Sequence, residues 1–136
     1  MTSTFATETI NFSPIDSIAG YFSNSADKID RSEIGLYEGL KYLFCSHAVM
    51  TEKLSNIGNT TKSQSLIKEV SDAIASVAYE DMASAFAAWC HRMVIEYVYQ
   101  SETSNSHLKQ LLSDLKQCSI FGSTAMGPGT ANFLTG

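Results

Sequence analysis

The stretch KSQSLIKEVSDAIASVAYEDMASAFAAWCHRMVIEYVYQ, residues 62–100, decides the fold of this chain. It contains neither Gly nor Pro and is rich in Ala, Val, Ile and Met, so it predicts helix throughout. One straight helix of this length would be about 58 Å long. A compact globule of this size is only about 35–40 Å across. Either the helix bends near Glu80-Asp81, or the protein is elongated and shares the apolar surface of the helix with another chain.

The apolar face of this stretch changes position along its length. The seam of the first half is apolar, and that of the second half is polar or small: Ile67, Val70, Ile74, Val77, then Asp81, Ser84, Ala88, His91, Ile95 and Val98. Beside the second half lies another stripe, formed by Met82, Ala85, Phe86, Trp89 and Met93. The rotation predicts that the two halves pack on different neighbours.

A second long helix is predicted from residue 31 to residue 57. Asp30 can cap its start and Glu33 can bond back to the capping residue, while Gly58 favours its end. A tight turn at Asn59–Thr61 would then lead into the stretch 62–100. The predicted seam has one polar member, His47, among apolar residues at spacings of three and four: Leu36, Leu40, Leu43, His47, Met50, Leu54 and Ile57. The two helices are therefore expected to form an antiparallel hairpin.

Charges give this hairpin a register. If the chain reverses at residues 59–61, three pairs of opposite charge face one another: Lys53 with Glu69, Glu52 with Lys68, and Lys41 with Glu80 or Asp81. Exposed pairs of this kind contribute under about 1 kcal/mol each, so they indicate register more than stability. The same register sets Met50 near Val70 and Leu43 near Val77.

Shorter helices are expected to brace the hairpin at both ends. The first is predicted from Ser13 to about Phe22, with the polar run 23–28 as a connection, and the last from Ser106 to Ser119. The last helix should fold back and bury Trp89. The predicted fold is all-α and four-helix-bundle-like, with an N-terminal arm at 1–12, a helical domain at 13–121, an uncharged tail at 122–136, and flexible termini.

Composition narrows the classes of function. Hydrophobic residues make up 44% of the chain, which is typical of a globular protein, and charged residues 17%, against a usual share of about a quarter. A weakly charged surface resists association poorly and favours a protein that works inside an assembly. The net charge is −5, and the nine Lys and Arg residues are scattered along the sequence, which argues against a nucleic-acid partner. No apolar run reaches the roughly 18 residues of a membrane span.

The number and spacing of the cysteines indicate the redox state of the compartment in which the protein works. Cys45, Cys90 and Cys118 form an odd number without CxxC spacing, which predicts free thiols in a reducing, cytoplasmic setting. The uncharged, Ser- and Thr-rich opening also suits secretion without a signal peptide, and this alternative stays open.

Side chains that could carry chemistry are few. Glu80 and Asp81 form an acidic pair, interpreted as a solvated face or partners of Lys41 rather than catalytic carboxylates. His47 and His91 lack the Glu-x-x-His spacing of bundle metal sites, and adjacent Cys90 and His91 point about 100° apart. Glycine-rich phosphate loops and hydrolase motifs are absent from the sequence. No metal and no cofactor are predicted.

The resulting hypothesis is a non-enzymatic helical interaction or assembly protein. It would bind a protein partner, or a second copy of itself as a homo-oligomer, through the long hairpin. The residues expected to contribute to the interface are His47, Trp89, His91, Phe133 and Leu134. The alternative is a small enzyme or small-ligand-binding bundle with a site near Trp89, His91 and Glu80.

Overall fold

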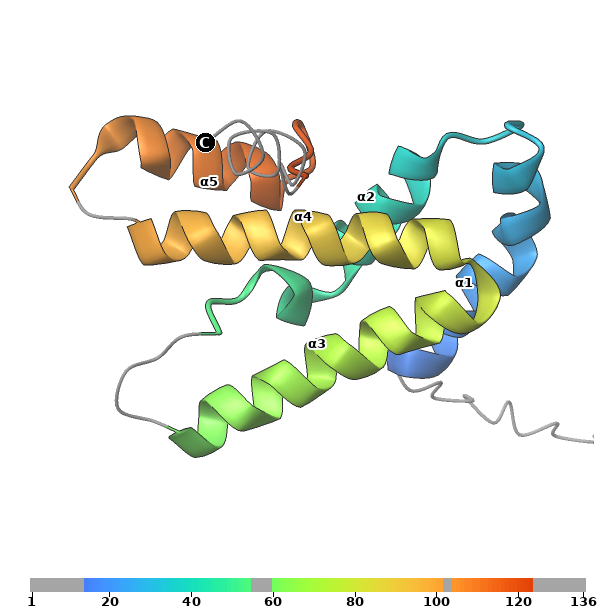
Figure 1. Cartoon of the computed structure of the whole chain (residues 1–136), viewed down its shortest axis with the longest axis horizontal. Coiled ribbons are helices and arrows are strands. Elements are labelled where there is room, and N and C mark those ends of the chain that lie inside the picture. The colour runs from blue at the N-terminus through green and yellow to red at the C-terminus, as the bar shows by residue number, and fades with distance from the viewer. Residues whose placement is uncertain (1–13, 55–59, 102–103, 124–136) are drawn as a thin grey trace, which may run out of the picture.

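The computed structural model describes residues 14–54, 60–101 and 104–123, and within these ranges the chain is all-α. The elements are α1 (Pro14–Asp30), α2 (Leu36–Ser46), the short 3-10 helix η1 (Ala48–Thr51), α3 (Thr60–Glu80), α4 (Met82–Ser101) and α5 (Ser106–Lys116). The predicted all-α fold, with a hairpin of two long helices braced by shorter helices, is confirmed, but α3 and α4 form the hairpin, not the predicted helices 31–57 and 62–100 (Figure 1). The arm at 1–12 and the tail beyond Ser123 lie outside the described residues.

The long hairpin consists of α3 and α4, which meet at Asp81. Of the two alternatives for the stretch 62–100, the break near Glu80-Asp81 is therefore correct. The Asp81 carboxylate accepts hydrogen bonds from the backbone N–H groups of Ala83 (3.0 Å) and Ser84 (3.2 Å), and from the Ser84 hydroxyl (2.5 Å). These bonds cap the start of α4, so the helix can be interrupted without Gly or Pro. The two helices diverge from this joint, and η1 lies between them toward their open end (Figure 1).

The predicted boundary between the first two helices is wrong, because α1 continues through the polar run 23–28. Asn24 donates to the carbonyl of Gly20 (2.9 Å) and Ser25 to that of Tyr21 (2.5 Å), so both side chains bond to the preceding turn of the same helix. Ser25, which belongs to the run predicted as a connection between helices, is buried in α1. Polar composition alone did not distinguish a partly buried helix from a loop.

The residues predicted to start the second helix instead end α1. Ser32 has a positive φ of 57°, and its N–H donates to the carbonyl of Ile29 (2.9 Å). The N–H of Glu33 donates to the carbonyl of Lys28 (2.8 Å). This pair of bonds around a left-handed residue is the Schellman motif, a common helix terminus. A Ser or Asp near Glu is therefore compatible with either end of a helix.

The predicted second helix is also too long, which invalidates the predicted hairpin register. Helix α2 ends at Ser46, and His47 has extended backbone angles (φ −127°, ψ 97°) before η1 begins. Helix α3 packs mainly against α1 and α4. None of the three predicted charge pairs forms among the described residues; Lys68 pairs with Asp72 on its own helix (2.5 Å). Gly58 and Asn59 lie outside the described ranges, and Thr60 already belongs to α3.

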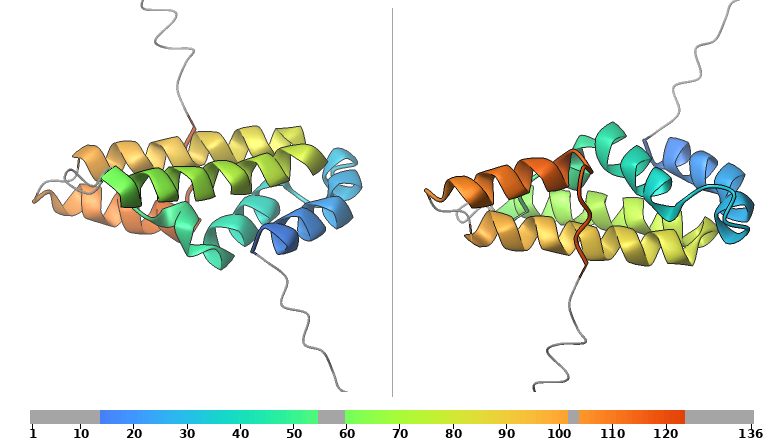
Figure 2. Two further views of the ribbon diagram at one scale, coloured as in Figure 1. Left: turned by 90° about the horizontal axis from the view of Figure 1, so that it is seen from below. Right: turned by 90° about the horizontal axis from the view of Figure 1, so that it is seen from above.

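Helix α5 ends earlier than predicted, and the chain then turns back across α4. Cys118 has a positive φ of 55°, and its N–H donates to the carbonyl of Leu115 (3.1 Å). The N–H of Ser119 donates to the carbonyl of Asp114 (3.0 Å), so the end of α5 is a second Schellman motif. The segment that follows crosses over α4 (Figure 2). Every helix contributes to one core, with these buried members: Ile18, Phe22, Leu40, Leu43, Phe44, Met50, Val70, Ala73, Val77, Ala85, Ala88, Ile95, Val98, Leu112, Leu115 and Cys118.

Candidate functional site

The outward face of α4 carries large apolar side chains that the described structure leaves exposed or half-buried. We call the set Met82, Phe86, Trp89, Met93 and Tyr97 the α4 outer stripe. Met82 is 69% exposed, Phe86 61%, Trp89 43% and Tyr97 50%, and Met93 is half-buried. At about 100° per residue the five lie within an arc of about 80°, and no charged residue falls inside that arc.

The predicted burial of Trp89 against α5 is wrong. Helix α5 packs on the side of α4 that carries His91, whose ring contacts the carbonyl of Leu115. Trp89 and His91 are separated by about 200° around the helix, so Trp89 faces outward. Its ring centroid lies 6.0 Å from that of Phe86, which makes the two aromatic rings one exposed cluster.

An apolar groove adjoins the stripe. It has a volume of about 380 Å³ and lies between α2, α4 and residues 121–123. Leu36, Tyr37 and Phe121 line it together with Phe86 from the stripe. The three groove residues are themselves partly exposed, so the apolar surface extends from α4 toward α2.

His91 is fully buried and fixes the segment after α5. Its Nδ1 accepts a hydrogen bond from the N–H of Gly122 (3.0 Å), so Nε2 carries the proton and donates to the carbonyl of Leu115 (3.1 Å). Burial lowers the pKa of His91, with a smaller contribution from nearby Arg92, against the opposing effect of the Leu115 hydrogen bond. The neutral imidazole of His91, hydrogen-bonded at both nitrogens, therefore connects α4 to the end of α5.

Gly122 is required where the chain passes over α4. A Cβ at this position would lie 2.6 Å from side-chain carbons of Val94, too close for any other residue to fit without a shift. The close approach lets the Gly122 N–H reach His91.

His47 is half-buried where α2 ends. Its Nδ1 lies 3.2 Å from the carbonyl of Leu43, its Nε2 lies 3.4 Å from the Ser17 hydroxyl, and its ring packs edge-on against Tyr42. The interactions hold α1 against α2. Both histidines proposed as interface residues thus make contacts inside the fold, and neither lies on the α4 outer stripe.

The acidic pair is divided between two environments. Glu80 is exposed at the end of α3, whereas Asp81 is buried and caps α4. In the described part of the chain, no group of three or more His, Cys, Asp and Glu side chains is arranged to hold a metal ion. The structure therefore does not bring together the alternative site near Trp89, His91 and Glu80: one residue is inside the core, and the other two lie on the surface.

A buried ion pair on α4 was missed by the sequence analysis. Arg92 and Glu96 are almost completely buried, with Arg92 Nη2 3.2 Å from Glu96 Oε2. Arg92 Nη2 also donates to the carbonyl of Glu52, and Glu96 Oε2 accepts from the N–H of Leu54 (3.0 Å). Burial lowers the pKa of Arg92, and Glu96 opposes that effect. The spacing i,i+4 was the available signal, but it is typical of exposed pairs as well.

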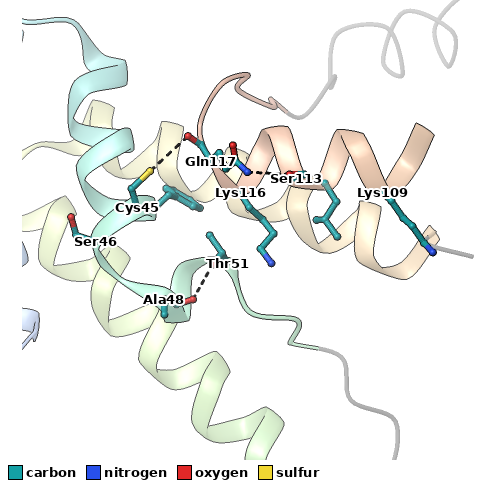
Figure 3. Close-up of a pocket in the computed structure, with 10 residues that line it drawn as sticks. Cys45, Ser46, Ala48, Thr51, Lys109, Ser113, Lys116 and Gln117 are labelled. Carbon is teal, nitrogen blue, oxygen red and sulfur yellow. Dashed lines mark hydrogen bonds between the residues drawn. The ribbon is translucent and has the colours of Figure 1, made fainter. Parts of the chain in front are cut away.

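Lysines gather around two adjoining pockets, which their scatter along the sequence did not predict. The larger, of about 710 Å³, lies between α5 and the α2–η1 segment; Lys109, Lys116, Ser113 and Cys45 are among its lining residues (Figure 3). The smaller, of about 310 Å³, shares Lys116 and adds two further lysines, Lys53 and Lys62. One acidic residue, Glu52, also lines the smaller pocket, so four lysines and one carboxylate give this side of an acidic protein a local excess of positive charge.

Comparisons with known proteins give no relative: no family model, curated protein or solved structure matches this chain. No helix within the described ranges is both long and apolar enough to cross a membrane. Two of the proposed interface residues, Phe133 and Leu134, lie outside those ranges.

Proposed function

We propose that this chain is a non-enzymatic assembly subunit that self-associates through the α4 outer stripe of its long hairpin. The observation that carries the proposal is the exposure of Met82, Phe86, Trp89 and Tyr97 on one uncharged helix face. Soluble monomers rarely expose continuous apolar surface of this kind, and extended patches usually mark interaction sites. Aromatic residues and Met are also the residue types enriched at protein interfaces.

The shape of the stripe favours a second copy of the chain as the partner. From Met82 to Tyr97 it is about 22 Å long, and Trp89 lies near its middle. A two-fold axis through that point would pair two α4 helices in antiparallel orientation, with Trp89 next to its counterpart and Met82 near the Tyr97 of the other copy. Because the stripe bears no charge, this pairing buries no unpaired ion.

A charge placed in the stripe tests the proposal. Phe86→Glu should weaken self-association at least about 100-fold, because an unpaired carboxylate would be buried at the interface. The matched control is Ile67→Glu on α3, where a 50% exposed apolar residue lies away from the stripe. Sedimentation velocity from 1 to about 100 μM would measure the effect.

The expected result is a dimer for the natural sequence and for Ile67→Glu, and a monomer for Phe86→Glu. Equal association of the two variants would show that α4 is not the interface. A natural chain that is monomeric throughout the range would reject self-association.

A further inference from the structure

Two cysteines from distant parts of the sequence lie near one another where α2 and α5 end, beside the larger lysine-lined pocket. Cys45, exposed near the end of α2, directs its Sγ toward the carbonyl oxygen of Gln117 at 3.7 Å (Figure 3). The next residue is Cys118, which is buried and whose Sγ lies 3.9 Å from Nε2 of His91. The third cysteine, Cys90, is buried on α4.

The backbone at Cys118 is also unusual. Its φ of 55° places it at the left-handed position of a helix terminus, where Gly or Asn is common and other residues are rare. The Schellman bonds around it fix the backbone that carries its side chain at the end of α5. The termination of α5 therefore places Cys118 directly after the Gln117 carbonyl that Cys45 contacts.

The pocket has the chemistry to admit an anionic small molecule. Two cationic side chains, Lys109 and Lys116, line it. Its volume of about 710 Å³ falls within the usual range for small-ligand sites, and Cys45 lies in its wall. An anionic molecule bound there would be adjacent to the exposed thiol.

We propose that Cys45 and Cys118 form a reversible disulfide, with an anionic low-molecular-weight disulfide of the glutathione type as the oxidant. The Cys45 thiolate attacks one sulfur of glutathione disulfide, the S–S bond breaks, and one glutathione leaves as a thiolate and takes up a proton. Cys118 then loses its proton, attacks Sγ of Cys45 and expels the second glutathione. Two protein thiols are oxidised, and one glutathione disulfide is reduced to two thiols that receive the two protons.

The structure sets the order of the two steps. Cys45 reacts first because it is exposed. Burial, together with the interaction with Cys45, raises the pKa of Cys118 to about 12, so Cys118 resists direct attack on the oxidant and serves as the resolving thiol. The bond would join the end of α2 to the end of α5 and raise the Tm, because it closes a long loop of the unfolded chain.

The test uses the full chain incubated with glutathione disulfide, then alkylated under denaturing conditions and weighed by mass spectrometry. We expect the loss of two of the three alkylatable thiols, so that the oxidised chain carries one alkyl group instead of three, and a tryptic link between the peptides containing Cys45 and Cys118. Cys118→Ser should stop at the mixed disulfide, with one glutathione on Cys45. Cys90→Ser, the matched control, should form the same bond as the natural chain.

Two results would overturn the proposal. The first is a natural chain that keeps glutathione on Cys45 while Cys118 remains alkylatable; the second is a link that includes Cys90. The role of the pocket has its own test. Lys109→Glu should slow oxidation by glutathione disulfide several-fold at low ionic strength, without slowing oxidation by the uncharged disulfide of 2-mercaptoethanol. Equal slowing of both reactions, or of neither, would reject the pocket as the binding site.

Discussion

The two faces of α4 both depart from the pattern of an ordinary amphipathic helix. The inward face buries three groups that favour water, His91, Arg92 and Glu96, among its apolar core residues, while the outward face exposes the α4 outer stripe. A surface helix of a monomer normally buries apolar residues and exposes polar ones. We therefore assign a separate role to each face of the helix: the inward face stabilises the fold, and the outward face is available to a partner.

The inward face fixes irregular segments of backbone. His91 bonds to Leu115 and Gly122, and the Arg92–Glu96 pair bonds to Glu52 and Leu54, so each buried polar group reaches a loop or a helix end. Buried backbone groups outside helices need such partners. The polar residues of α4 therefore stabilise the fold, and the outward face remains for a partner.

The largest expected effect comes from breaking the buried ion pair. Arg92→Met should lower the free energy of unfolding by about 3–5 kcal/mol, because the Glu96 carboxylate would stay buried without its cation. Urea denaturation monitored by circular dichroism measures the change. The double variant Arg92→Met/Glu96→Met should recover part of the loss, since apolar pairs often replace buried ion pairs at little cost. A loss below about 1 kcal/mol in the single variant would contradict the role given to the inward face.

A smaller effect is expected at the joint of the hairpin. Asp81→Ala should cost about 1–2 kcal/mol because it removes the acceptor that caps α4, whereas Asp81→Asn keeps an acceptor and should cost less. Both variants would be compared by chemical denaturation. Equal costs for Ala and Asn would show that the cap does not maintain the break.

The smallest effect is the pH dependence contributed by His91. Burial lowers its pKa in the folded chain below the ordinary value of about 6.5, so the unfolded chain binds a proton where the folded chain does not. The stabilisation is complete above that value, and it falls as the pH decreases from about 6.5 toward the folded pKa, by at most about 1.4 kcal/mol per pH unit. The difference in unfolding free energy between the natural chain and His91→Gln, measured from pH 7.5 to 5, isolates this term. A difference that does not change with pH would contradict it.

The sequence predicted the elements whose signals are local and strong. The helical character of 62–100 and its break near Glu80-Asp81 follow from composition and length. The position of the break at Asp81 could also have been predicted, because Ser84 lies three residues after it, which is the spacing of a helix cap. The predicted start of the second helix is wrong because the residues near Ser32, which can cap the start of a helix, here form the end of α1. Helix termini formed by left-handed Ser or Cys give no glycine signal.

The candidate surface was only partly predictable. Trp89 was placed among interface residues, yet it was also expected to be buried by α5, because a stripe of apolar residues does not reveal which neighbour covers it. The contact of Cys45 with the Gln117 carbonyl, next to Cys118, depends on how α2 and α5 terminate, which no spacing in the sequence indicates. Contacts between residues that are far apart in the sequence could be identified only from the folded structure.

Fluorescence of Trp89, the single tryptophan of the chain, tests the central claim most directly. In an isolated chain its side chain is 43% exposed, so self-association through the α4 outer stripe should transfer it out of water. The account predicts that its emission maximum moves to shorter wavelength as the concentration rises from nanomolar to tens of micromolar, and that Phe86→Glu abolishes this shift. An emission maximum that stays constant while the natural chain associates would contradict the account, because the partner would then bind elsewhere.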